Sequence, residues 1–291
     1  MNFYEVYGPS ARDCYASCAP VTFGDHYNQV CGKVSQIPWN ELTRILALQL
    51  GRYEEMDKTT HMVLLVEPDP KDRSTPRTRI VTKAVSQILW DRDTYERWKN
   101  HHQLFNTVRT EPYAKSLLGD LFEPPFHALC IRGASFKIYP ITDNRSAGPT
   151  NYTFTNNVLN ESKSETLTLH DYRRLPFNTT CPISNLLASH YYQPTTPNHP
   201  SYDSFIYDAN SHQISAFQVT VAVEHDLAEE GIIGLRDLAQ ELEINDLKIR
   251  IILVVLEDAQ VSFKIKMGFF HELGLEVYVL QVTEDQLYSF P

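Results

Sequence analysis

The sequence predicts an α/β protein with a mixed sheet, and the C-terminal third carries the strongest signals. From residue 214 onward the pattern alternates as strand, helix, strand, helix, strand. An alternating strand at about 214–223 precedes an amphipathic helix at 230–242, and the continuous apolar run 248–256 is typical of a strand buried on both faces. Two successive strand–helix–strand crossovers favour a three-layer α/β core.

The elements before residue 110 are mainly helical by their pattern. Helices are expected where apolar residues recur three and four positions apart, at about 38–56, 80–90 and 94–107. The apolar run 61–67 predicts a short buried strand, and the proline-bearing stretch 68–79 predicts a loop. We therefore divide the chain into a small, mainly helical region, residues 1–110, and an α/β domain, residues 111–291.

The first half of the α/β domain has a weaker pattern. A helix is expected at about 112–122, and it should end or kink at Pro124 and Pro125 because an internal proline costs about 3 kcal/mol. A strand pair should follow, at 128–131 and 135–141. Residues 142–200 are polar and rich in turn residues, which indicates an insertion with small strands of its own, including an edge strand at 166–170.

The last elements follow the apolar strand 248–256. A short helix is expected at about 260–273, closed by Gly274 at the position where helices favour glycine. The final strand is expected at 275–282.

Composition and charge limit the functions open to this chain. The formal net charge is −10, which argues against tight non-specific binding to nucleic acid, although a local basic strip remains compatible with it. No apolar run is long enough to span a membrane, and the N-terminus lacks the basic and apolar regions of a signal peptide. Five scattered cysteines form neither a disulfide framework nor a paired zinc pattern. These features favour an intracellular protein, nuclear or cytoplasmic, without membrane partners.

The stretch 200–226 carries the candidate chemistry. Asp203 opens one strand, a polar turn follows at 208–211, and a second strand begins near Ile214. The strand period of two places Phe217 and its apolar neighbours on a core face and Gln218, with Thr220, on a small polar face beside Asp203. A carboxylate beside amide and hydroxyl oxygens is the start of a divalent-metal site. An ordinary half-exposed strand explains the same spacing.

Three groups of residues resemble one family. The string P-S-Y-D-S-F-I at 200–206, then F-Q-V-T at 217–220 and His225, resembles the restriction-endonuclease-like domain, of PD-(D/E)xK type, of fungal Crinkler-like and retrotransposon-hot-spot-like proteins. The string L-G-D-L-F-E at 118–123, with His127, resembles that family's G-x-x-F-E-x-x-x-H helix. Residues 8–14, with Arg12, resemble the G-x-x-x-R stretch that follows the family's ATPase module; a solvated surface arginine is the alternative.

The resemblance implies a set of site residues. Glu123, Asp203 and Gln218 would ligate Mg²⁺ or Mn²⁺, and His225 would carry a proton or contact substrate. Gln218 stands where the family has an acidic residue, and Thr220 stands where it has a lysine. The candidate substitutes for that lysine charge are Lys137, Lys264 and Lys266.

The resemblance also implies a fold and a function. The fold would be a three-layer restriction-endonuclease-like core, preceded by the tail of an ATPase module. The function would be metal-dependent phosphodiester hydrolysis of nucleic acid, DNA rather than RNA; the alternative is a catalytically silent nuclease fold that binds nucleic acid or protein. No G-x-x-x-x-G-K-[ST] phosphate loop occurs in the chain, so a separate ATPase chain is a candidate partner.

Overall fold

The protein divides into two compact units, residues 1–125 with 290–291 and residues 126–289. The predicted boundary at 110/111 stays a prediction. Of the helices described, none is long and apolar enough to cross a bilayer. This structure is a computed structural model, and it describes residues 28, 31–32, 64–68, 73–74, 76–81, 85, 95–109, 115–141, 163–177, 183–195, 199–221, 224–226, 228–244, 246–257, 259, 262–264 and 275–289.

The described part of the first unit holds a hairpin and helices. Strands β1 (Leu64–Pro68) and β2 (Pro76–Ile80) pair antiparallel, so the predicted loop at 68–79 is wrong over the residues of β2. Helix α6 (Tyr95–Arg109) confirms the helix expected at 94–107. The helix expected at 38–56 lies outside the described residues.

Helix α7 (Lys115–Arg132) runs through both prolines, so the predicted end at this point is wrong, whereas the alternative of a kink stays a prediction. The strand expected at 128–131 is also wrong, because these residues are the last turns of α7. Proline removes backbone hydrogen bonds, but tertiary burial of one helix face offsets that cost. Phe122, Phe126 and Cys130, spaced four apart, are all fully buried.

The second unit is built on an eight-stranded mixed sheet, which confirms the α/β class with a mixed sheet. Parallel pairs join β8 to β10, β10 to β12 and β5 to β6, and the remaining neighbours are antiparallel. The three-layer restriction-endonuclease-like form of this fold stays a prediction. In spatial order the strands are β4 (Glu165–Thr168), β3 (Ser135–Pro140), β12 (Glu276–Val282), β10 (Lys248–Leu256), β8 (Gln213–Val219), β7 (Ser204–Asp208), β6 (His190–Pro194) and β5 (Arg173–Phe177).

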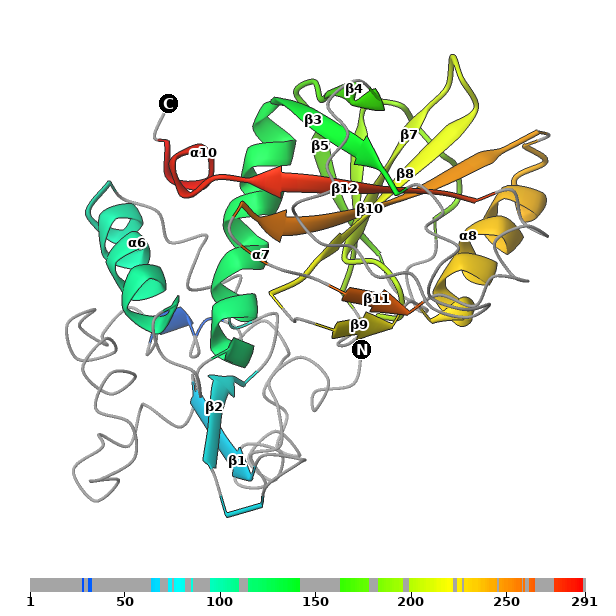
Figure 1. Ribbon diagram of the computed structural model, residues 1–291. Coiled ribbons are helices and arrows are strands. Elements are labelled where there is room, and N and C mark those ends of the chain that lie inside the picture. Colours follow the sequence, from blue (N-terminus) through cyan, green and yellow to red (C-terminus); the bar gives the residue numbers. More distant parts are fainter. Residues whose placement is uncertain are drawn as a thin grey trace. The chain divides into compact units, whose positions relative to one another are not determined.

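The sheet is strongly curled, and its connections require this. Strands β4 and β5 form opposite edges, yet only residues 169–172 link them. Such a link spans at most about 18 Å, whereas the edges of a flat eight-stranded sheet lie about 34 Å apart. Figure 1 shows the strand direction turning from β12 and β10, in red and orange, to β7 and β8, in yellow. The segment expected as an insertion at 142–200 thus supplies β4, β5 and β6 to the main sheet.

Helices lie against both faces of this sheet. On one face, Phe126 of α7 contacts the rings of Phe136 and Phe217. On the other face, Ile232 and Leu235 of α8 (Glu229–Glu241) join a buried apolar cluster with side chains of β7, β8 and β10. The strands expected at 248–256 and 275–282 and the helix at 230–242 are confirmed by β10, β12 and α8.

Three short elements remain in the described chain, two strands and one helix. Strands β9 (Glu224–Asp226) and β11 (Ser262–Lys264) pair parallel as a separate small sheet, so the helix expected at 260–273 is wrong over β11. Helix α10 (Glu284–Tyr288) begins with a capping box in which Thr283 and Gln286 exchange hydrogen bonds.

Candidate functional site

Asp203 and Gln218 lie side by side, as the pairing of their strands requires. Strands β7 and β8 are antiparallel neighbours, and the backbone N–H of Asp203 donates to the Phe217 carbonyl at 2.8 Å. The Asp203 Oδ2 accepts the Gln218 Nε2–H at 2.8 Å and the Val219 N–H at 2.9 Å. The two side chains are only 5% and 8% exposed. The carboxylate is therefore held by two neutral N–H donors in a buried position.

The loop before Asp203 is fixed against the first turn of α8. Ser201 adopts a left-handed backbone conformation, φ 72°, and its hydroxyl donates to the Ala228 carbonyl. A Cβ on Gly231 would overlap the Pro200 carbonyl, 2.7 Å from its carbon atom. Only glycine lets the helix approach the loop this closely, and this approach sets where the chain enters β7.

The surroundings of Gln218 differ from the small polar face that the strand period predicts. Ile214 and Ala216, which share its face, lie in the apolar cluster with Ile232 of α8. Phe217, on the opposite face, is also fully buried. Strand β8 is therefore covered on both faces, because it lies in the middle of a sheet with helices on both sides.

The other predicted site residues fall in different places. Glu123 is half-buried in α7 and belongs to the first unit. His127, one turn later, belongs to the second unit and is 2% exposed. The backbone of His225 pairs with Phe263 between β9 and β11, and its side chain lies outside the described residues. The Lys137 side chain is exposed on β3, whereas the side chains of Lys264 and Lys266 lie outside the described residues.

A buried hydrogen-bonded group lies on the α7 face of the sheet. The Tyr191 hydroxyl is 2.7 Å from the His127 Nδ1 and 2.6 Å from the Ser204 Oγ. The Cys130 thiol lies near this hydroxyl. Burial, followed by the nearby Cys130, raises the pKa of the Tyr191 phenol well above its ordinary value. The phenol is therefore neutral and can act as both donor and acceptor.

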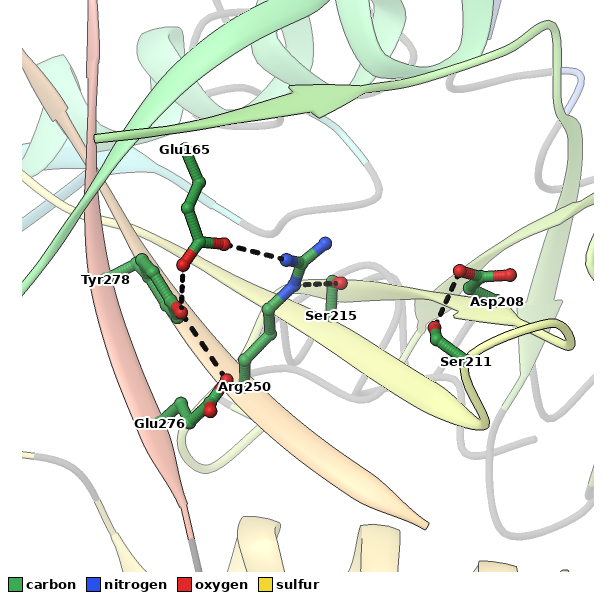
Figure 2. Close-up of polar contacts among 7 residues, drawn as sticks. All are labelled: Glu165, Asp208, Ser211, Ser215, Arg250, Glu276 and Tyr278. Carbon is green, nitrogen blue, oxygen red and sulfur yellow. Dashed lines mark hydrogen bonds and ion pairs between the residues drawn. The ribbon is translucent and has the colours of Figure 1, made fainter. Parts of the chain in front are cut away.

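A charged cluster lies toward the other end of β8, and the sequence patterns did not single it out. The Arg250 Nε donates to the Ser215 Oγ at 2.6 Å, and its Nη1 lies 4.0 Å from the Glu165 Oε2. The Tyr278 hydroxyl is 2.9 Å from Glu165 and 3.4 Å from Glu276. Figure 2 shows these side chains converging from β4, β8, β10 and β12. We call these five residues the Arg250 cluster.

Burial governs the electrostatics of the Arg250 cluster. It lowers the pKa of Arg250, and Tyr278 with the nearby carboxylates opposes that shift. Burial also raises the pKa of Tyr278, and the hydrogen bond with Glu165 adds to this rise. One sequence signal could have found the cluster: Arg250 is a lone charge inside the apolar run K-I-R-I-I-L-V-V-L, and a buried charge needs partners.

The described residues offer a partial donor set for a divalent ion. Asp203 supplies carboxylate oxygen, the ligand type that Mg²⁺ and Mn²⁺ prefer. Gln218 directs its nitrogen, not its oxygen, at that carboxylate. Among the described residues, no three His, Cys, Asp or Glu side chains are grouped so that they could hold a metal ion. The fit therefore needs the Gln218 amide to turn over and a further ligand to join.

No protein-family model, curated protein or solved structure matches this chain.

Proposed function

We propose that this chain is a metal-dependent phosphodiesterase that acts on nucleic acid, with Asp203 and Gln218 at the centre of its site. The supporting observation is their contact: two residues that the family resemblance pairs as ligands are 15 positions apart in sequence and 2.8 Å apart in space. They lie where the ladder of β7 and β8 ends. Two strands thus present two oxygen-bearing side chains at one point of the sheet.

Each residue has a defined task in this proposal. Asp203 holds the divalent ion through its carboxylate, while the Val219 N–H keeps that carboxylate oriented. Gln218 would ligate the ion through Oε1 in place of its N–H bond to Asp203, and Glu123 is the third ligand that the family resemblance implies. His225 is the proposed proton carrier, since imidazole titrates near neutrality. When bound, the ion supplies an activated water and charge stabilisation at the phosphate. With two carboxylates and one amide, we expect weak metal affinity.

A catalytically silent module for binding nucleic acid or protein is the second candidate, and one observation favours it. Asp203 Oδ2 already accepts two hydrogen bonds, one of them from Gln218 itself. The hydrogen-bonding capacity of this carboxylate oxygen is thus met within the chain, as expected for a pair that only stabilises the fold. Thr220 offers no positive charge at the position of the family's lysine.

The experiment measures cleavage and metal binding in the same variants. Labelled single- and double-stranded DNA and RNA are incubated with Mg²⁺ or Mn²⁺ and with an EDTA control. Asp203→Ala should abolish cleavage, and Asp208→Ala should not, because Asp208 is an exposed carboxylate at the other end of the same strand. Gln218→Glu should tighten Mn²⁺ binding by about tenfold, since it adds a negative charge beside the ion. Adding Thr220→Lys should raise the cleavage rate, because it restores a positive group near the developing charge.

The two candidates give opposite results. If folded wild type and the folded Gln218→Glu, Thr220→Lys variant both lack metal-dependent cleavage, the phosphodiesterase proposal fails. Binding of nucleic acid or protein that Asp203→Ala leaves unchanged would then support the silent module. Cleavage by wild type that EDTA and Asp203→Ala both abolish would exclude that module.

A further inference from the structure

The Tyr191 hydroxyl is a junction of three buried side chains. Tyr191 and Ser204 are fully buried, and His127 is 2% exposed. His127 and Ser204 both hydrogen-bond to the one phenol oxygen, and Cys130 lies near it. A hydroxyl has one proton and two lone pairs, so it can donate to one of these partners and accept from the other. The phenol oxygen therefore links the His127 and Ser204 side chains.

This junction joins helix α7 to strand β7 next to Asp203. His127 and Cys130 belong to α7, Tyr191 to β6, and Ser204 is the first residue of β7. The pair Ser204–Phe217 is the last one in the β7–β8 ladder, and Asp203 lies one residue beyond it. Residues at a ladder end open more readily than those inside it. A side-chain bond at Ser204 therefore acts where the backbone restrains the chain least.

Asp203 is restrained from both faces of the sheet. Toward α8, the loop before it is fixed by the Ser201–Ala228 bond and by the close approach at Gly231. Toward α7, the adjacent Ser204 is fixed by the Tyr191 hydroxyl. Successive strand residues point to opposite faces, so the Ser204 bond restrains the Asp203 backbone without competing for its carboxylate.

We propose that Tyr191 is a positioning residue for Asp203. Its hydroxyl holds Ser204 in place by a hydrogen bond, and this keeps the Asp203 carboxylate within hydrogen-bonding distance of the Val219 N–H and the Gln218 amide. The position of the Asp203 carboxylate can be measured in the folded chain without any reaction. Its consequence for metal binding rests on the proposed function.

The experiment compares two tyrosines that are neighbours in β6. Tyr191→Phe removes the junction oxygen and keeps the ring that stacks on Phe217. Tyr192→Phe is the matched control: Tyr192 is also fully buried, but its hydroxyl bonds the backbone of Leu187 and Asn185, away from the junction. Both variants lose one buried phenol oxygen, so a general loss of stability affects both.

Three measurements report on the position of the Asp203 carboxylate. The first is hydrogen exchange of the Val219 amide, with the Ala216 amide inside the ladder as internal reference. The second is the chemical shift of the Gln218 side-chain NH₂. The third is Mn²⁺ affinity. In Tyr191→Phe we expect Val219 exchange to rise about threefold to tenfold relative to Ala216, the effect of weakening one hydrogen bond. We also expect the Gln218 signals to move and Mn²⁺ affinity to fall, with none of these changes in Tyr192→Phe.

A second variant tests the same bond from its other end. Ser204→Ala removes the Ser204 hydroxyl and leaves the His127–Tyr191 contact in place, so it should reproduce the Val219 and Gln218 changes. It also carries the test if Tyr191→Phe does not fold. Unchanged Val219 exchange and Gln218 shifts in the folded variants would overturn the proposal. If these signals change while wild type binds no Mn²⁺, the positioning role stands and the proposed function fails.

Discussion

The Asp203 pair and the Arg250 cluster lie toward opposite ends of β8, and they hold charge in different ways. Asp203 is 5% exposed and is bonded by a backbone N–H and a short amide side chain. In the Arg250 cluster, the Glu165 side chain is 52% exposed, and its distance to the Arg250 Nη1 is 4.0 Å. The first site uses fixed neutral donors, and the second uses long charged side chains in partial contact with water.

The difference predicts how each site responds to change. A backbone donor loses no side-chain entropy when it bonds a carboxylate, whereas Arg and Glu each lose rotamer freedom to meet. Solvent also screens a half-exposed ion pair, so its net contribution is small. We therefore expect the Asp203 end to be rigid and costly to disturb, and the Arg250 end to be adaptable.

The largest expected effect comes from the glycine that fixes the Asp203 loop. Gly231→Ala places a methyl group against the Pro200 carbonyl, so α8 or the loop must move. We expect a loss of about 3 kcal/mol in the free energy of unfolding, at the upper end of overpacking costs. Gly234→Ala, in the same helix, is the control, because its Cβ would meet nothing within 4 Å. That change should stabilise by up to about 1 kcal/mol through helix propensity.

Urea denaturation of both glycine variants measures this difference. Equal free energies of unfolding for Gly231→Ala and Gly234→Ala would mean that the loop can move away from α8 without destabilising the fold. The rigidity assigned to the Asp203 end would then be wrong.

The hairpin around Asp203 could be predicted from sequence because its signals are local. A polar turn at 208–211 and alternating strands on either side fix the pairing, and the structure confirms it with β7 and β8. The strand at 248–256 could also be predicted, because its six consecutive apolar residues, 251–256, are typical of a strand buried on both faces. The contact of Asp203 with Gln218 follows from this pairing alone.

The errors lie where tertiary packing outweighs local preference. Pro124 and Pro125 predicted an end or a kink, but α7 does not end there, and apolar residues on both sides of the prolines are buried. The Arg250 cluster was missed because Glu165 and Tyr278 are 113 residues apart and meet only through the order of the strands. The expected polar face of β8 was wrong because α8 covers it.

Double-mutant cycles compare the two sites directly. For Asp203→Asn with Gln218→Met we expect a coupling of about 2 kcal/mol, as for a buried hydrogen bond to a charged group. For Glu165→Gln with Arg250→Gln we expect less than about 1 kcal/mol, because the pair is long and half-exposed. Denaturation at low and high salt gives both coupling energies. Only the Glu165–Arg250 coupling should fall in 0.5 M salt, where the screening length is about 4 Å. A stronger coupling at Glu165 than at Asp203 would reverse the comparison.

The smallest expected effect concerns Asp208, the exposed counterpart of Asp203 at the other end of β7. A hydrogen bond from the Ser211 Oγ, 2.6 Å from Oδ2, is the main cause that lowers the pKa of Asp208 below its ordinary 3.8. A lowered pKa means that the ionised form stabilises the fold: this contribution is complete above pH 3.8 and is lost as the pH falls through the lowered value. Ser211→Ala should therefore raise the NMR titration midpoint of the Asp208 carboxyl toward 3.8. Asn210→Ala is the control, because the bond at that position comes from the backbone N–H and survives the change. Equal midpoints in the two variants would show that the turn backbone, and not the Ser211 hydroxyl, holds this charge.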